Sequence, residues 1–159
     1  MLFRSPGRLR LIELWNRSNN MFHLASDLGE VQTMLSGSRG GDWVRSGQAA
    51  DTFDFTSQPV GIVEPQAACR VYNRFNLQVR YAANLADCNA LAEAGWVRDG
   101  TSFMVALANG GVCASGSSPV YEFSGAGDRY RYAMSEGERD QSIRGGWAGG
   151  NVVFCLPNR

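Results

Sequence analysis

Residues 69–105 read CRVYNRFNLQVRYAANLADCNALAEAGWVRDGTSFMV and contain one complete structural unit. The pattern of apolar residues predicts two short strands, 69–73 and 78–81, joined by a polar turn. Asn84 is a typical N-cap residue, and the apolar positions after it have the spacing of a short helix. A Gly-Trp step ends this helix and leads into a last strand, expected over 101–107. The segment therefore predicts a strand–strand–helix–strand unit.

Two other segments repeat this pattern with the same register. A helix cap recurs in each copy, and a carboxylate follows each cap by three positions, as in a capping box. The caps are Asp27, Asn84 and Ser135, and the carboxylates are Glu30, Asp87 and Glu138. A tryptophan closes each copy, and the unit recurs about every 50 residues, a spacing typical of arrays of supersecondary units. These tryptophans are Trp43, Trp96 and Trp147.

One unit of this kind cannot bury both its sheet and its helix, so the three copies must share a core. We predict an α+β fold in which three pseudo-repeats of strand–strand–helix–strand pack around this core with approximate threefold symmetry. Residues 1–10 are interpreted as a tail or linker, and residues 11–157 as a single repeat domain. The tryptophans are expected to pack in the core, because each takes the same place in its unit. The repeats cover about 11–55, 69–107 and 119–157.

The charge balance argues against partners that long-range electrostatics would recruit. The chain has 159 residues, with 15 basic and 15 acidic side chains and a formal net charge of zero. It therefore lacks the basic field expected of a protein that binds nucleic acid or an anionic membrane surface. No apolar run approaches the roughly 20 residues of a membrane-spanning helix. Residues 1–15 lack a signal-peptide core and cleavage site, so the chain is either cytosolic or its export signal is missing from this sequence.

The four cysteines favour export. They lack the Cys-x-x-Cys pairs of a zinc ribbon, and four cysteines allow three disulfide connectivities. Cys69 opens the first strand of the central unit and Cys88 lies in the first turn of its helix, which favours a local disulfide between them. Cys113 precedes the first strand of the last unit and Cys155 lies in its final strand, which favours the second pair. The alternative is four free, buried thiols in a reducing compartment.

No constellation of catalytic residues is found. His23 is the only histidine, so a multi-histidine metal site is excluded in a single chain. It has no accompanying nucleophile motif, such as Gly-x-Ser-x-Gly, and is interpreted as a structural or surface residue. The three carboxylates are interpreted as helix-cap partners rather than a glycosidase pair. We therefore predict no enzyme, with no catalytic residue, metal or cofactor.

Aromatic side chains on short strands beside polar turns are the candidates for a binding surface. Aromatic faces with nearby Asn and Arg donors suit sugar rings or a peptide. Packing between strands is the alternative explanation for the same residues. The candidate ligand-binding residues are Trp15, Asn16, Tyr72, Asn73, Arg74, Tyr121 and Tyr130.

Several short segments carry a resemblance to a known family. They are Glu13-Leu-Trp-Asn16 with Asp42-Trp-Val-Arg-Ser-Gly47, Cys69-Arg-Val-Tyr-Asn73 with Ala86-Asp-Cys88, and Pro119-Val-Tyr121 with Val153-Phe-Cys-Leu-Pro157. Over about residues 11–157 the chain resembles a family of uncharacterised secreted repeat domains, often C-terminal on bacterial secreted hydrolases and surface proteins. The resemblance implies export, disulfides and an ancillary role, such as attachment to a surface or a glycan. Copies in that family usually carry a histidine in the second strand, where this chain has Met21 or Phe22, Val79 and Tyr130.

These observations favour a non-catalytic extracellular or periplasmic binding module that recognises a glycan, a cell-envelope component or a protein partner. A lectin-like, carbohydrate-binding role is one form of this hypothesis. The alternative is a structural or accessory subunit of a larger surface complex or filament. The expected partners are thus a glycan or a surface protein, or assembly of the chain with itself or into a larger complex. Nucleic acid and a membrane span are not expected.

Overall fold

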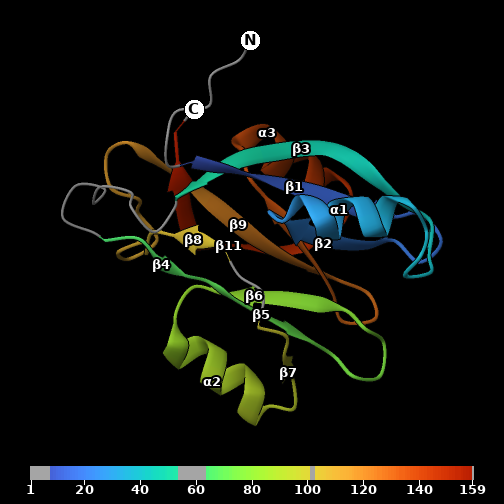
Figure 1. Ribbon diagram of the computed structural model, residues 1–159. Helices are drawn as coiled ribbons and strands as arrows, with labels where there is room; N and C mark the ends of the chain where they lie inside the picture. The colour runs from blue at the N-terminus through green and yellow to red at the C-terminus, as the bar shows by residue number, and fades with distance from the viewer. Residues whose placement is uncertain (1–7, 54–63, 101–102, 159) are drawn as a thin grey trace.

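A computed structural model of the protein describes residues 8–53, 64–100 and 103–158. These residues form an α+β fold of antiparallel sheets and short helices (Figure 1). The helices are α1 (Leu28–Leu35), α2 (Leu85–Glu93) and α3 (Glu136–Arg144). The strands are β1 (Arg8–Asn16), β2 (Met21–Ala25), β3 (Trp43–Phe53), β4 (Gln66–Ala67), β5 (Cys69–Tyr72), β6 (Val79–Ala82), β7 (Val97–Arg98), β8 (Met104–Val105), β9 (Ser117–Gly125), β10 (Arg129–Ala133) and β11 (Ala148–Pro157).

The strands form three sheets with a common local order. In each sheet the first strand of a unit lies between the second strand and the strand that follows the helix: β2-β1-β3, β6-β5-β7 and β10-β9-β11. The first sheet is extended by β8 and β4, so that a strand of the central segment pairs with β3. The three hairpin turns, between β1 and β2, β5 and β6, and β9 and β10, lie at one end of the molecule, on the right in Figure 1.

The helices begin at the predicted residues. The side chains of Asp27, Asn84 and Ser135 each accept a hydrogen bond from a backbone N–H three residues later, at Glu30, Asp87 and Glu138. Such a bond satisfies one of the N–H groups that a helix leaves free at its N-terminus. The cap prediction is therefore confirmed for all three helices.

A central hydrophobic cluster receives corresponding residues from the three units. The residues three positions before the helix caps are Leu24, Tyr81 and Tyr132, and all are buried in this cluster. The ring centroids of Tyr81 and Tyr132 lie 5.1 Å apart, an edge-to-face arrangement that aromatic pairs favour. Phe103 and Phe154 pack against these tyrosines. Full burial of a phenylalanine stabilises a fold by about 1.5–3 kcal/mol.

Each helix covers a smaller cluster on its own sheet, and the repeated tryptophans lie there. Trp43, Trp96 and Trp147 are partly buried against residues of their own units, such as Leu14, Val71 and Phe123. The tryptophans are thus packed, as expected, but in these peripheral clusters. The central cluster is built from tyrosine, phenylalanine and aliphatic side chains instead.

Both predicted disulfides are present in the structure. Cys69 bonds to Cys88, which fastens β5 to α2, and Cys113 bonds to Cys155, which fastens the segment before β9 to β11. The described residues include no free cysteine.

The strand bounds differ from the prediction at both ends of the first unit. β1 begins at Arg8, because β3 is long enough to pair with it as far as Phe53, so residues 8–10 are not a tail. β3 also runs through Gly47, and its pairing with β1 changes register between Ile12 and Leu14. The rest of the predicted tail, residues 1–7, and residues 54–63 lie outside the described residues.

The last strand of the central unit is shorter than predicted. In place of one strand over 101–107, the structure has β7 (Val97–Arg98) and β8 (Met104–Val105), with residues 101–102 outside the described part. Gly100 has a φ of +78°, a left-handed conformation that interrupts an extended strand.

Candidate functional site

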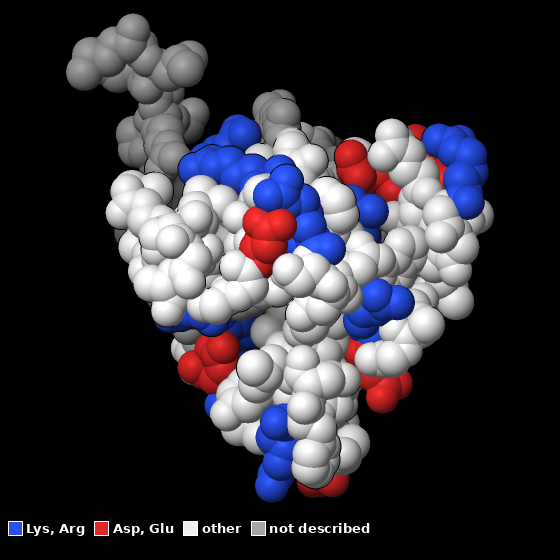
Figure 2. All heavy atoms as spheres, turned by 90° about the vertical axis from the view of Figure 1, so that its right-hand side faces the viewer, with Lys and Arg blue, Asp and Glu red and all other residues white. Residues whose placement is uncertain are grey.

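Residues of the three hairpin turns line an open surface pocket of about 450 Å³, which we call the turn pocket. Its volume is in the range of small-molecule sites. Figure 2 views the molecule from the end where the turns lie, and there small groups of basic and acidic side chains are scattered over a mostly uncharged surface. The residues that line the turn pocket are Asn19, Met21, Asn76, Gln78, Ala126, Gly127 and Arg129.

The three turns supply these residues from corresponding positions. Asn19, Asn76 and Gly127 lie eight residues before the helix caps, and Met21, Gln78 and Arg129 lie six residues before them. The residue between each pair has a positive φ: 58° at Asn20, 61° at Leu77 and 56° at Asp128. Asn and Asp tolerate this left-handed conformation, because their short polar side chains bond locally, whereas Leu does not. The β5–β6 turn therefore holds a strained residue where the other two turns do not.

Hydrogen bonds fasten the turns to one another. The Arg129 side chain donates from Nε to the backbone oxygen of Ala126 at 2.7 Å and from Nη1 to that of Asn19 at 3.1 Å. Asn76 donates from Nδ2 to the backbone oxygen of Gly127 at 3.4 Å. Its Oδ1 accepts a bond from the backbone N–H of Gln78, which closes its own turn. The side chains of Arg129 and Asn76 are thus held by hydrogen bonds to backbone oxygens of the turns.

Gln78 is the most informative residue of the pocket. Its side chain is fully buried, and Nε2 donates to the backbone oxygen of Val79 at 2.8 Å. That bond fixes the orientation of the amide, because an exchange of the two amide atoms would place two oxygens together. Oε1 has no hydrogen-bond partner among the described residues. A buried acceptor without a partner costs about 1–3 kcal/mol.

Two exposed apolar side chains flank Asn76 in the sequence. Phe75 is 91% exposed and Leu77 is 66% exposed. An exposed aromatic ring beside convergent amide groups is typical of surfaces that bind sugars or peptides. Together with the strain at Leu77, this exposure suggests that the β5–β6 turn is shaped for contact rather than for stability.

The residues predicted to bind a ligand lie around these turns, but none of the seven lines the turn pocket. Trp15 is half-buried and donates from Nε1 to Oδ1 of Asn20 at 2.9 Å. Asn16 is buried, and its Oδ1 accepts bonds from the backbone of Ser18 and Asp42. Both residues therefore serve the β1–β2 hairpin.

The other candidates divide between two hairpins. Tyr72 packs partly buried against the central cluster, while Asn73 caps the β5–β6 turn by accepting a bond from the N–H of Phe75, and Arg74 is exposed. Tyr121 is buried in the cluster beneath α3. Tyr130 is half-buried, with the guanidinium of Arg80 4.3 Å from its ring centroid. The prediction of these seven as ligand-binding residues stays a prediction.

The pocket residues were missed because their types are common in turns. Asn19 and Asn76 read as ordinary turn chemistry, and Met21 and Gln78 as strand residues. The repeat pattern could have indicated them, because most of them lie six or eight residues before a helix cap in each of the three units.

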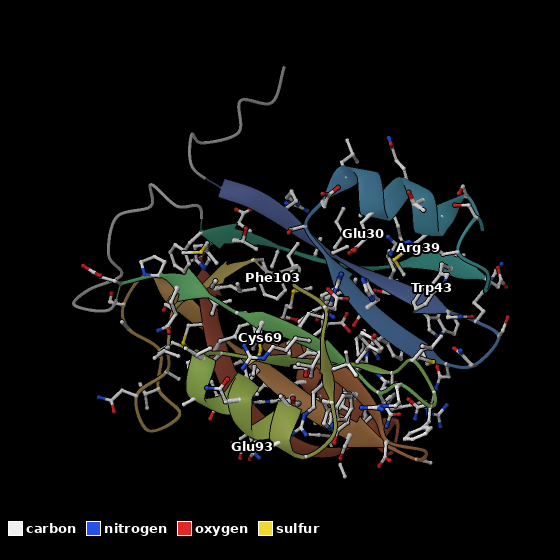
Figure 3. All side chains as sticks on the ribbon, turned by 60° about the horizontal axis from the view of Figure 1, so that its bottom comes forward. Glu30, Arg39, Trp43, Cys69, Glu93 and Phe103 are labelled. Atoms are coloured by element: carbon white, nitrogen blue, oxygen red, sulfur yellow. A yellow bond between two sulfur atoms is a disulfide. The ribbon has the colours of Figure 1, made fainter. Side chains whose placement is uncertain are left out.

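His23 and Glu30 belong to a buried ionic cluster between the first and central units. Arg70 donates to both carboxylate oxygens of Glu30 at 2.8 Å, and from Nε to Asp99 at 2.9 Å. Glu30 also lies near Arg39, 3.8 Å away (Figure 3). The prediction that Glu30 serves as a cap partner is therefore wrong for its side chain: the backbone N–H is capped, while the carboxylate neutralises Arg70.

The cluster shifts the pKa values of its members. Burial alone would raise the pKa of Glu30, but the hydrogen bonds from Arg70 oppose this and bring the pKa far below its ordinary value. Burial lowers the pKa of His23, and the charge of Arg70 lowers it further. His23 Nε2 lies 2.7 Å from Nη1 of Arg70, which only donates, so the imidazole is neutral and accepts there. This is a structural histidine, as interpreted from the sequence.

Two further ion pairs occupy corresponding places between the other units. Arg131 bonds to the buried Glu13 at 3.2 Å and to Glu138 at 3.5 Å. Arg80 bonds to Glu122 at 3.0 Å. Burial raises the pKa of Glu13, against the opposing effect of Arg131. Each carboxylate of these pairs is thus explained by a neighbouring arginine.

Two searches of the described residues concern other kinds of site. No group of three or more His, Cys, Asp or Glu side chains that could hold a metal ion occurs among them. Likewise, within residues 8–53, 64–100 and 103–158, no helix is both long and apolar enough to cross a membrane.

The fold and the turn pocket define a disulfide-bonded α+β domain with a surface pocket among its hairpin turns. The chain belongs to the family named DUF5648, a domain of unknown function, whose model matches residues 10–156. This agrees with the resemblance to an uncharacterised domain family. Comparisons with curated proteins and with solved structures gave no match.

Proposed function

We propose that the protein is a non-catalytic binding module that recognises a saccharide of a glycan or of the cell envelope in the turn pocket. The observation that carries this proposal is the buried Oε1 of Gln78, which has no hydrogen-bond partner among the described residues. A ligand that donates a hydrogen bond there would remove the cost of the unpaired acceptor. The unpaired Oε1 of Gln78 in the free protein would thus favour binding of a hydrogen-bond donor.

The pocket chemistry favours a saccharide among hydrogen-bond donors. Sugar hydroxyls both donate and accept, so one ring could donate to Gln78 and accept from Asn76. Phe75, next to Asn76 in the sequence, has an exposed ring against which an apolar sugar face could pack. A pocket with a few convergent polar groups beside an aromatic ring matches this ligand class.

The same chemistry argues against catalysis at this place. The lining residues include no carboxylate, histidine, serine or cysteine, the groups that usually act as nucleophile, acid or base. Asn, Gln, Met and Arg position and bind ligands instead.

We propose an extracellular or periplasmic location, since stable disulfides form in oxidising compartments. The pairs Cys69–Cys88 and Cys113–Cys155 support this. The mass of native material, measured with and without reductant before alkylation, tests it. Native protein in which all four thiols react without reductant would argue for a reducing compartment.

We also propose that the three units share an approximate threefold axis that passes near the turn pocket. The hydroxyl of Tyr81 bonds to the backbone of Leu24, and the hydroxyl of Tyr132 accepts from the backbone N–H of Tyr81 at 2.8 Å. Each tyrosine thus contacts the corresponding residue of the preceding unit. At the corresponding contact between the first and last units, Leu24 has no hydroxyl. There Gln48 donates to the backbone oxygen of Tyr132 at 2.9 Å instead.

A titration of labelled full-length chain with saccharides tests the binding proposal. The variant Gln78→Leu removes the unpaired acceptor and is expected to weaken saccharide binding at least about tenfold, the equivalent of one hydrogen bond. Its free energy of unfolding is expected to change little, because loss of the buried unpaired oxygen offsets loss of the Nε2 bond to Val79. Gln141→Leu, on the exposed face of α3, is the matched control. Unchanged affinity in a folded Gln78→Leu protein would refute the site.

The alternative is a structural subunit that uses the same turn as a contact surface. The exposure of Phe75 and Leu77 is the observation that favours it. It predicts regular assemblies in native mass measurements without any saccharide, and their loss in Phe75→Ala but not in Val112→Ala, which alters another exposed apolar residue.

A further inference from the structure

We infer that the saccharide of the turn pocket is acidic, and that Arg129 is the counter-ion of its carboxylate. This inference rests on the proposed function and names the ligand class within it. The reasons lie in the geometry of Arg129, in the charge of the pocket lining and in the position of Gln78.

Arg129 is held in place with part of its donor capacity free. Its Nε and Nη1 bond to the backbone oxygens of Ala126 and Asn19, in two different turns. A guanidinium has five N–H donors in a planar fork, so the bonds to Ala126 and Asn19 leave donors on Nη1 and Nη2. Because the group is fixed on backbone atoms, it would lose little side-chain entropy when an anion binds.

The charge of Arg129 has no carboxylate partner among the described residues. Most buried and half-buried arginines of the protein do have one, such as Arg70, Arg80 and Arg131. Among the described residues, Arg129 is also the only charged one that lines the turn pocket. The neighbouring Asp128 is exposed and forms no ion pair with it within 4 Å. The pocket therefore presents an uncompensated positive charge.

The two unmatched groups of the pocket have opposite requirements. Arg129 requires an acceptor, best an anion, and Gln78 Oε1 requires a donor. A sugar acid supplies both on one small ring, with a carboxylate for Arg129 and a hydroxyl for Gln78. A neutral sugar satisfies Gln78 alone, and a simple carboxylate satisfies Arg129 alone. The volume of about 450 Å³ leaves room for a ligand that reaches both.

Matched pairs of sugars test this inference in the full-length chain. Each pair differs only by a carboxylate at C6: glucuronic acid with glucose, galacturonic acid with galactose, and mannuronic acid with mannose. Binding is followed by chemical-shift changes in labelled protein, which report weak affinities. In at least one pair the acid is expected to bind about tenfold or more tightly than the neutral sugar, the usual effect of a charge-assisted hydrogen bond. Its affinity is expected to fall with added salt.

Variants of Arg129 distinguish its role as a counter-ion from its hydrogen bonds to the turns. Arg129→Gln is expected to abolish the preference for the acid and leave the neutral sugar unchanged, whereas Arg129→Lys is expected to retain part of the preference. Arg144→Gln, outside the pocket lining, is the control for the loss of one positive charge. Near-ultraviolet circular dichroism checks that each variant keeps the native packing. Loss of acid and neutral binding together in a folded Arg129→Gln protein would show that Arg129 only holds the turns, and would overturn the inference.

The outcomes distinguish this inference from the proposed function. Equal binding of acid and neutral sugars, unaffected by Arg129→Gln, would overturn the acidic ligand and keep the saccharide module. Binding of acetate as tight as that of the sugar acids would overturn the saccharide part of the inference. No shift with any sugar would overturn both the inference and the proposed function.

Discussion

Arg70 and Glu30 form a bidentate ion pair between two units, with both η nitrogens 2.8 Å from the carboxylate oxygens. Arg70 is only 4% exposed and also bonds to Asp99. Removing one member of such a buried pair leaves the other charge without compensation and costs about 3–5 kcal/mol. The pair therefore ties the first unit to the central one more strongly than a surface salt bridge would.

The variant Glu30→Gln is expected to lower the free energy of unfolding by about 3–5 kcal/mol at neutral pH, because Arg70 then keeps only Asp99 as a carboxylate partner at this place. Denaturant unfolding measures this change. Glu93→Gln, an exposed carboxylate at the end of α2, is the control and is expected to change stability by less than about 0.5 kcal/mol. Equal effects of the two variants would contradict the role of the cluster.

Stability is expected to fall on acidification, in two ranges of pH. The folded protein holds the pKa of His23 below its ordinary value of 6.5, so below about pH 6.5 the unfolded chain binds more protons. The pKa of Glu30 is also lowered, and its stabilising effect is lost further down, as pH falls below its ordinary value of 4.5.

Melting temperatures measured between pH 8 and pH 5 test the histidine part. The variant His23→Gln does not titrate there, so its melting temperature is expected to change less over this range than that of the wild type. A variant that shows the full wild-type dependence would place the pH sensitivity elsewhere.

The hydroxyl bonds of Tyr81 and Tyr132 test the proposed threefold arrangement. Burial raises the pKa of both phenols, so they remain protonated. Tyr81→Phe and Tyr132→Phe each leave buried backbone groups of the preceding unit without a partner, and each is expected to cost about 1–3 kcal/mol. Tyr72→Phe, half-buried, is the control. A large loss in only one of the two buried variants would argue that the contacts are not equivalent.

Leu77 is expected to lower the stability of the fold, and we expect the protein to retain it because its side chain contacts the ligand. Its φ of 61° suits the Asn20 and Asp128 of the other turns, and so Leu77→Asn should stabilise the fold by about 0.5–1 kcal/mol. The same change removes an exposed apolar side chain between Asn76 and Gln78, two residues of the turn pocket, and should weaken saccharide binding. Thermal unfolding and a saccharide titration measure the two effects. A variant that is both less stable and unimpaired in binding would contradict this explanation.

The sequence was sufficient for the local structure. Helix caps are short-range chemistry, so Asp27, Asn84 and Ser135 could be read directly. The pairing of Cys69 with Cys88 followed from the closeness of a strand start and a helix start. The side chain of Glu30 could not be placed in the same way, because its partner Arg70 is distant in sequence and meets it only when the units pack.

The site was harder to predict for a related reason. The sequence pointed to polar turns beside aromatic strands, and the turn pocket lies among those turns. The residues that line it depend on how three separate hairpins converge, which no local pattern encodes. An unpaired oxygen such as Oε1 of Gln78 becomes visible only when every neighbouring donor has been placed.

The central claim is that a saccharide binds in the turn pocket, and the most direct test is a chemical-shift titration of labelled protein with sugars. The backbone amides of Met21, Gln78 and Arg129, together with the side-chain amide of Gln78, are expected to shift with a common affinity. Shifts confined to other parts of the chain, or no shift at any of these residues with neutral and acidic sugars alike, would contradict it.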